Sequence, residues 1–298
     1  MISTDKNSEP LKSLGFNLEG LTQLGAFIGL YAENVARIGA SMQPYLEKMA
    51  PTLAALAKTD WVAAKRRLDE LPTKSKEAMV LASSKGWFFG WHESLPELMA
   101  LIEKLDVIEK TAVDALMGQY YRNNLQPFTD EIVQKYPHRA SVIKAAVKAH
   151  CTFDPGGYFL SIPVFIAQTN GLLIEITGEK SAMERTRDKK PELKASRALR
   201  VKLGTDQKSL DLIDPILELH KMDFMKNPKE REVSAALSGE IFTALNRHQV
   251  VHGESFDYGT EINSLKAFSF LAFVGLHIPL ILDSALERRV PSLNPPIN

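Results

Sequence analysis

The sequence feature that most constrains the fold is a spacing of apolar residues every three or four positions, which recurs along most of the chain. This spacing places apolar side chains on one face of a helix. Strand signals are scarce, because few stretches alternate with a period of two and Asn-Gly turns between β-branched runs are absent. The pattern predicts an all-α protein, a multi-helix bundle of about ten helices. The runs that carry it are residues 21–38, 53–68, 98–108, 142–149 and 210–220.

Prolines and glycines indicate where these helices begin and end. Proline is tolerated in the first turn of a helix and disrupts a helix interior, so we expect several prolines to start helices or to lie between them. These are Pro51, Pro72, Pro96, Pro127, Pro137, Pro155, Pro191 and Pro228. We expect a helical region over residues 1–77, a helical domain over residues 78–290 and a tail over residues 291–298. The first 13 residues and the tail are expected to be disordered.

Composition excludes several classes of protein. Lys and Arg together number 36, as do Asp and Glu, so a site for a polyanion must come from local clustering. The single cysteine, Cys151, excludes an intramolecular disulfide and fits a cytoplasmic location. The N-terminal sequence has no signal-peptide pattern. The most apolar run, residues 267–282, is short for a membrane span and contains His277 and Pro279, so it predicts a buried helix and no membrane association.

One segment departs from charge neutrality. Residues 180–202 carry nine Lys or Arg against three Asp or Glu. The segment could be a solvated excursion between two core helices, or a basic surface that contacts nucleic-acid phosphates. The interspersed acids and the lack of aromatic residues favour the first interpretation. The residues that would bind nucleic acid in the second are Lys189, Lys190, Lys194, Arg197 and Arg200.

A cluster near the C-terminus combines Arg247, His248 and His252 within six residues. If residues 237–252 form one helix, the two histidines share a face, and Gly253 would end that helix. The next helix is expected to begin near Thr260, with Thr260 or Asp257 as its cap.

Three interpretations of this cluster compete. The basic residues could cap a helix end and pair with Glu254, Asp257 or Glu261. The His-x-x-x-His spacing could bind zinc, but Gln249 stands where a zinc protease needs a glutamate, and no third ligand is evident. The third interpretation is metal-free RNA cleavage, in which a histidine transfers protons and an arginine binds the phosphate. We therefore expect no metal and no cofactor.

The cluster also resembles a known family. The run Arg247-His248-Gln249-Val250-Val251-His252 matches the R-x-x-x-x-H motif of HEPN domains, and the longer stretch NRHQVVHGESFDYGTEINSLKAFSFLAFV is similar to the C-terminal signature of bacterial HEPN-like proteins. Residues 85–95, 136–150 and 160–178 resemble other parts of these proteins. The resemblance covers residues 78–285.

The resemblance implies an HEPN-like helical bundle, commonly a homodimer, with the motif near the dimer axis. Many members are metal-independent ribonucleases of defence and toxin–antitoxin systems, which implies RNA as substrate and an antitoxin or defence partner. Other members are inactive binding or assembly modules. Transferred by position, Arg247 would bind the scissile phosphate and His252 would be the general acid/base. His248 would orient the pair or bind phosphate.

Three further residues are candidates for supporting roles. Asn246 directly precedes the motif, and the resemblance implies that it supports Arg247 and His252. Related proteins often have an acidic residue where this chain has Asn170, and Glu175 could replace it one turn later. Tyr258, on the loop after the motif, is either a hydroxyl that supports the site or a packed tyrosine.

Two other features predict core rather than chemistry. The aromatic group Trp87, Phe88, Phe89 and Trp91 is typical of a core or interface anchor. His277 lies in the apolar last helix and is expected to be a hydrogen-bonded core histidine.

Overall fold

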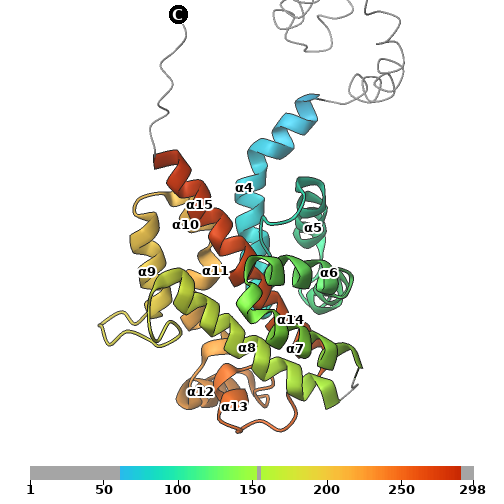
Figure 1. The fold of residues 1–298 in the computed structure, drawn as a ribbon, viewed down its shortest axis with the longest axis vertical. Coiled ribbons are helices and arrows are strands. Elements are labelled where there is room, and N and C mark those ends of the chain that lie inside the picture. Colours follow the sequence, from blue (N-terminus) through green and yellow to red (C-terminus); the bar gives the residue numbers. More distant parts are fainter. Residues whose placement is uncertain (1–60, 153–155, 290–298) are drawn as a thin grey trace, which may run out of the picture. The chain divides into compact units, whose positions relative to one another are not determined.

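The fold of this chain is given by a computed structural model, which describes residues 61–152 and 156–289 (Figure 1). The described residues contain helices and no strand, which confirms the all-α prediction. The helices are α4 (Trp61–Ser84), α5 (Leu95–Val107), α6 (Val113–Lys135), α7 (Ala140–Thr152), α8 (Gly156–Thr177), α9 (Lys194–Leu203), α10 (Gln207–Leu212), α11 (Asp214–Leu217), α12 (Pro228–Ser238), α13 (Arg247–Val251), α14 (Glu261–Ala272) and α15 (Ile278–Arg289).

The chain divides into two compact units, residues 1–71 and 72–298. The division falls within α4, and the boundary expected at residue 77 lies in the same helix. The apolar run at residues 21–38, Pro51, Pro155 and the tail lie outside the described residues. The following description concerns the second unit.

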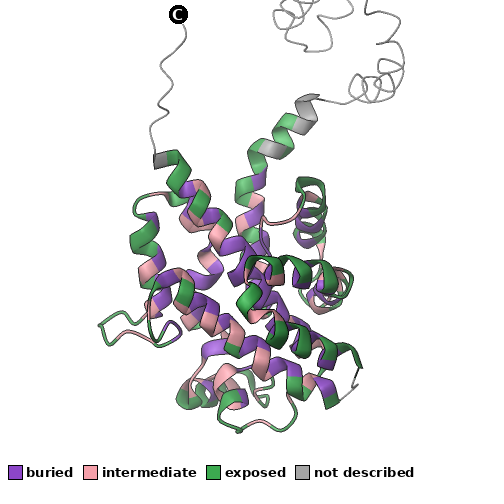
Figure 2. Ribbon diagram, viewed as in Figure 1, coloured by how far each residue is buried: buried purple, intermediate pink, exposed green. Residues whose placement is uncertain are grey.

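The core of the second unit is built around α14. Every residue of this helix from Ala267 to Ala272 is buried, so its C-terminal half is covered on all sides. It packs against α8 and α6, and α7 packs in turn against α8 (Figure 1). Phe268, Phe270 and Leu271 are at most 1% exposed, and Figure 2 shows the buried residues concentrated where these helices meet.

The aromatic group before α5 completes this core. Trp87, Phe88 and Phe89 are nearly inaccessible to solvent, and the ring of Phe88 lies 4.5 Å from that of Phe270. The indole of Trp87 stacks on Tyr121 at 5.8 Å and donates a hydrogen bond to Asp114 at 2.8 Å. Trp87, Phe88 and Phe89 are therefore core residues, as predicted, whereas Trp91 is only partly buried.

A π-helical turn, η4 (Phe273–His277), joins α14 to α15 without interrupting the helical path. His277 in this turn is fully buried, as predicted for a core histidine. Its Nε2 donates to the carbonyl of Leu212 at 2.9 Å, and its Nδ1 accepts from the backbone N–H of Trp91 at 2.9 Å. The ring thus joins the last helix to two other segments of the unit.

Two helical stretches of the described chain are long and apolar enough to cross a membrane, Gly156–Thr177 and Glu261–Arg288. In their most apolar windows, 39% and 78% of the residues are buried inside the protein. The second stretch, which contains the apolar run at residues 267–282, is therefore mostly covered by other parts of the same chain.

The proline predictions were right at some positions and wrong at others. Pro96 and Pro228 lie in the first turn of α5 and α12, and Pro137 begins a short 3₁₀ turn before α7. Pro72 and Pro127, in contrast, lie inside α4 and α6. In α6 the neighbours Leu125, Phe128 and Thr129 are all buried, so tertiary packing holds the helix together across the missing backbone hydrogen bond.

Candidate functional site

The Arg247–His252 segment lies on a short helix rather than at the end of a long one. Helix α12 ends at Ser238, where Gly239 adopts a left-handed conformation with φ of 72°, and α13 begins only at Arg247. The expectation of one helix over residues 237–252 is therefore wrong, because a glycine at the C′ position ends the first helix. Gly253, with φ of 70°, follows α13 as predicted.

Asn246 fixes the start of α13. It is 1% exposed, and its side-chain oxygen accepts the backbone N–H of Gln249 at 3.1 Å, which makes it the N-cap. Its amide nitrogen donates to the carbonyls of Asp223 at 2.7 Å and Lys226 at 2.9 Å. These three bonds engage both ends of the amide, so Asn246 supports the site by positioning the backbone that carries Arg247 and His248.

The acidic residues near the cluster pair with other partners. Glu254 forms an ion pair with Arg231, Glu261 binds Arg122 at 2.6 Å, and Asp257 accepts from Ser255. The first interpretation required one of these acids to pair with the cluster, and none of the three does so. Thr260 caps α14 by accepting the N–H of Asn263 at 3.2 Å, which confirms one of the two predicted caps.

Arg247 has no ion pair with any carboxylate in the described part of the chain, and its Nε is buried without a hydrogen-bond partner there. Burial lowers the pKa of its guanidinium. A partly buried cation without a carboxylate costs stability, and such groups usually have a ligand or a functional role.

The two histidines of the cluster stack on each other. The rings of His248 and His252 lie 5.5 Å apart and 19° from parallel, as expected for positions i and i+4 of a helix. Burial lowers the pKa of His248, and the positive charge of Arg247 lowers it further. His248 is therefore held as a neutral imidazole, able to accept or donate one hydrogen bond at each nitrogen. His252 is exposed at the end of the helix.

Arg247 and His248 line a pocket of about 510 Å³ between α8, the loop that follows it, and α13. Asn170 of α8 and two basic residues of the loop, Lys180 and Arg185, also line it. His252 is not part of the lining. The full lining consists of Asn170, Lys180, Ser181, Met183, Glu184, Arg185, Met225, Asn227, Arg247 and His248.

None of the three proposed supporting residues, Asn246, Glu175 and Tyr258, lines this pocket. Glu175 accepts hydrogen bonds from Arg139 and from His138, and the Arg139 bonds lower the pKa of its carboxyl. Tyr258 donates its hydroxyl to the carbonyl of Phe159 at 3.2 Å and packs its ring against Phe159. Tyr258 is therefore a packed tyrosine in this structure, whereas Asn170 does line the pocket.

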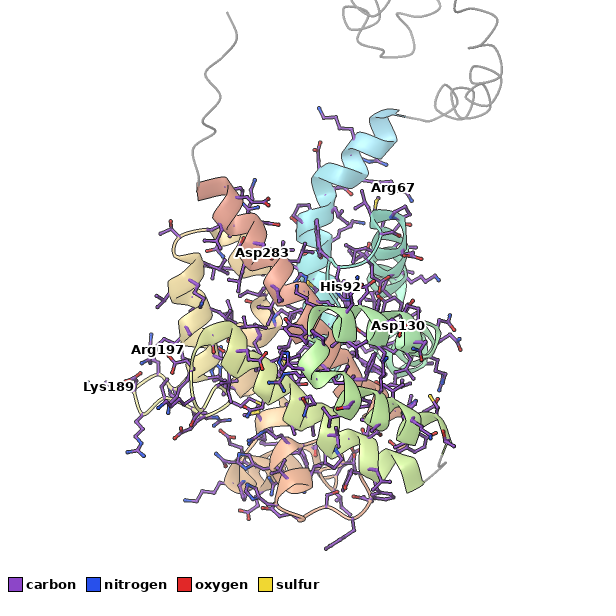
Figure 3. All side chains as sticks on the ribbon, viewed as in Figure 1. Arg67, His92, Asp130, Lys189, Arg197 and Asp283 are labelled. Carbon is purple, nitrogen blue, oxygen red and sulfur yellow. The ribbon has the colours of Figure 1, made fainter. Side chains whose placement is uncertain are left out.

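The basic segment is largely neutralised by its own acids. Lys194 pairs with Glu184 at 2.6 Å, Arg197 with Asp188 and Glu192, and Arg200 with Glu192 and Glu218. Lys189 and Lys190 are exposed, and Lys189 lies on the loop before α9 at the edge of the molecule in Figure 3. This arrangement favours a solvated excursion over a nucleic-acid surface.

Sequence reasoning missed Lys180, Arg185 and Asn227 as neighbours of the motif. They lie 20 or more positions away from Arg247, and no local pattern relates them to it. The only available signal was that Lys180 and Arg185 belong to the basic segment.

No group of three or more His, Cys, Asp or Glu residues that could hold a metal ion lies within the described ranges. A comparison with protein-family models gives no match, and no curated protein and no solved structure matches the chain. The HEPN resemblance therefore stays a prediction.

Proposed function

We propose that the chain is a metal-independent endoribonuclease of the HEPN type. The observation that carries the proposal is Arg247, a half-buried cation without a carboxylate partner, which lines the same pocket as His248. The ring of His248 in turn stacks on His252, which connects His252, outside the pocket lining, to the two residues that line the pocket. The resemblance of the sequence to HEPN domains supports the same assignment.

In this reaction the RNA supplies its own nucleophile. The 2′-hydroxyl loses its proton to a base and attacks the adjacent phosphorus, while the bond from phosphorus to the 5′-oxygen breaks. The departing 5′-oxygen takes up a proton, and the products are a 2′,3′-cyclic phosphate and a 5′-hydroxyl. His252 is the general acid/base, His248 orients it, and Arg247 stabilises the charge on the phosphate oxygens.

The biological setting follows from the resemblance only. We propose a cytoplasmic enzyme of bacterial defence or a toxin, active as a homodimer and controlled by an antitoxin or defence partner. A dimer would bring two motifs together, which would supply a second histidine for the second proton transfer.

A non-catalytic RNA- or nucleotide-binding module is the second candidate. Two observations favour it: Asn170 lines the pocket where related proteins often have an acid, and His252 does not line the pocket. In that case Arg247 would bind a phosphate without cleavage.

The test is incubation of purified protein with total RNA in EDTA. Wild type should produce fragments with 2′,3′-cyclic phosphate ends, and both Arg247→Ala and His252→Ala should abolish them. His138→Ala, which removes an exposed histidine paired with Glu175, is the matched control and should cleave like wild type. Intact RNA with folded, dimeric wild-type protein would favour the binding module.

A further inference from the structure

We propose that Lys180 and Arg247 form a two-point phosphate subsite for the backbone of single-stranded RNA, in which Arg247 holds one phosphate and Lys180 holds the next. The proposal rests on the ribonuclease assignment and specifies how the substrate is held. RNA would then be recognised in the pocket, and not by Lys189, Lys190, Lys194, Arg197 and Arg200 of the basic segment.

The charges of the pocket lining separate into compensated and uncompensated groups. Arg185 is bound by both oxygens of Glu230, at 2.5 and 2.9 Å, and also donates to the carbonyl of His220 at 2.7 Å. Glu184 is neutralised by Lys194 at 2.6 Å. These two pairs contribute no net charge to the pocket.

Lys180 and Arg247 are the cations left over. Neither forms an ion pair with a carboxylate of the described chain, and both line the same pocket. Two uncompensated positive charges that face one cavity attract oxyanions, and guanidinium and ammonium groups are the usual protein ligands of phosphate. The protein leaves the guanidinium of Arg247 unsatisfied, because its buried Nε has no hydrogen-bond partner among the described residues.

The remainder of the lining suits a nucleotide better than an isolated phosphate. The pocket, at about 510 Å³, has more space than a phosphate group fills. Met183 and Met225, which are 3% and 2% exposed, form an apolar wall that could contact the face of a base. The side-chain amide of Asn170 has no hydrogen-bond partner within the described chain, and an amide can both donate to and accept from a base edge.

Lys180 is distinguished from Lys189, Lys194, Arg197 and Arg200 of the same segment by two properties together, the lack of a carboxylate partner and a place in the pocket lining. Lys194, Arg197 and Arg200 are paired with acids, so a phosphate would have to displace a carboxylate to reach them. Lys189 is exposed, as Lys180 is, but it does not line the pocket. Lys180 has no ion pair with a carboxylate of the described residues and lines the same pocket as Arg247.

The experiment measures binding of a 2′-O-methyl RNA oligonucleotide by fluorescence anisotropy over a range of salt concentrations. This oligonucleotide has no free 2′-hydroxyl, so it cannot be cleaved and binding is measured separately from chemistry. Each phosphate contact on a single strand contributes a slope of about 0.7 to log K against log salt. Lys180→Ala should reduce the slope by about this amount and weaken binding to all sequences alike. Lys180→Arg should keep the slope, and Lys189→Ala, the matched control, should not change it.

The outcomes separate this proposal from the ribonuclease assignment. Loss of slope in Lys180→Ala but no cleavage of natural RNA by wild type would sustain the subsite and reject the enzyme. An unchanged slope in Lys180→Ala, an equal loss in Lys189→Ala, or no binding by wild type would overturn the subsite. Displacement of the oligonucleotide by inorganic phosphate at an equal concentration of phosphate groups would indicate a small-anion site and would also overturn it.

Discussion

The backbone N–H of Trp91 donates to Nδ1 of His277 at 2.9 Å, although the two residues are 186 positions apart. The opposite nitrogen of the ring donates to the carbonyl of Leu212. Both nitrogens are therefore used by a neutral imidazole, and a proton added at Nδ1 would remove the acceptor that Trp91 needs. Because His277 is also fully buried, burial lowers its pKa to about 4.

This relationship predicts that acid destabilises the fold. The folded pKa of His277 is below its ordinary value of 6.5, so its stabilising contribution is complete above pH 6.5 and is lost as the pH falls to 4. The loss should reach roughly 3 kcal/mol at pH 4. His92 should add to this loss of stability in acid. Its ring nitrogens are buried without partners in the described chain, and burial lowers its pKa to about 3. Urea unfolding from pH 7 to pH 4 measures the loss, and a free energy of unfolding that stays constant would contradict it.

Glu93 should act in the opposite direction. Burial raises the pKa of its carboxyl to about 7, and its Oε1 has no hydrogen-bond partner within the described residues. The stability that goes with the neutral acid is present below pH 4.5 and is lost as the pH rises through 7. Glu93→Gln should therefore unfold at higher urea than wild type at pH 8, with a smaller difference at pH 5. The exposed Glu109→Gln serves as control, and an equal gain in that variant would show that the effect is not due to burial.

Gly90 should not tolerate a side chain. A Cβ at this position would lie 2.3 Å from Cγ of His277, so Gly90→Ala must displace the ring that holds Trp91 and Leu212. We expect a loss of about 1–3 kcal/mol in the free energy of unfolding, typical of overpacking. Gly156→Ala, whose new Cβ would meet no atom within 4 Å, should be close to neutral. Thermal unfolding followed by circular dichroism compares the two variants, and equal melting temperatures would argue against the contact.

Asn246 should matter for folding rather than for chemistry. Asn246→Ala removes the cap of α13 and leaves the carbonyls of Asp223 and Lys226 without their donor, so we expect a loss of about 2–3 kcal/mol. Thr260→Ala, which removes a cap alone, should cost about 1 kcal/mol. The ratio of the two losses, measured by urea unfolding, checks the assignment. A catalytic role would be indicated if Asn246→Ala lost activity with unchanged stability.

Arg247, in contrast to Asn246, should matter for chemistry and reduce the stability of the fold. Its buried, unpartnered Nε costs desolvation in the free protein, so Arg247→Met should unfold at a higher temperature, with a gain of about 1 kcal/mol. The same variant should lose RNA cleavage, because a thioether cannot stabilise charge on a phosphate. The melting temperature and the EDTA cleavage assay together test this trade-off. A less stable variant would mean that Arg247 contributes mainly to the fold.

Local signals in the sequence were sufficient for the helical class, the apolar core helix α14 and the Thr260 cap, because each depends on residues close together in the chain. They were insufficient where the outcome depended on tertiary contacts. Pro127 stays inside α6 because buried neighbours hold the helix together, and only the fold brings Lys180 into the lining of the same pocket as Arg247. The motif itself could be predicted from sequence, but the pocket around it could not, since its walls come from four separate segments.

The π-helical turn at Phe273–His277 sets the rotational phase of the last helix. Such a turn accommodates one residue more than an α-helical path would, and one residue corresponds to about 100° of rotation around the axis. Ile281 and Ala285 of α15 are 5% and 2% exposed, so the helix that follows the turn has a buried face. The spacing of apolar residues in α14 therefore does not continue into α15. If residues 261–289 were treated as one regular α-helix, the buried faces of its two halves would not align.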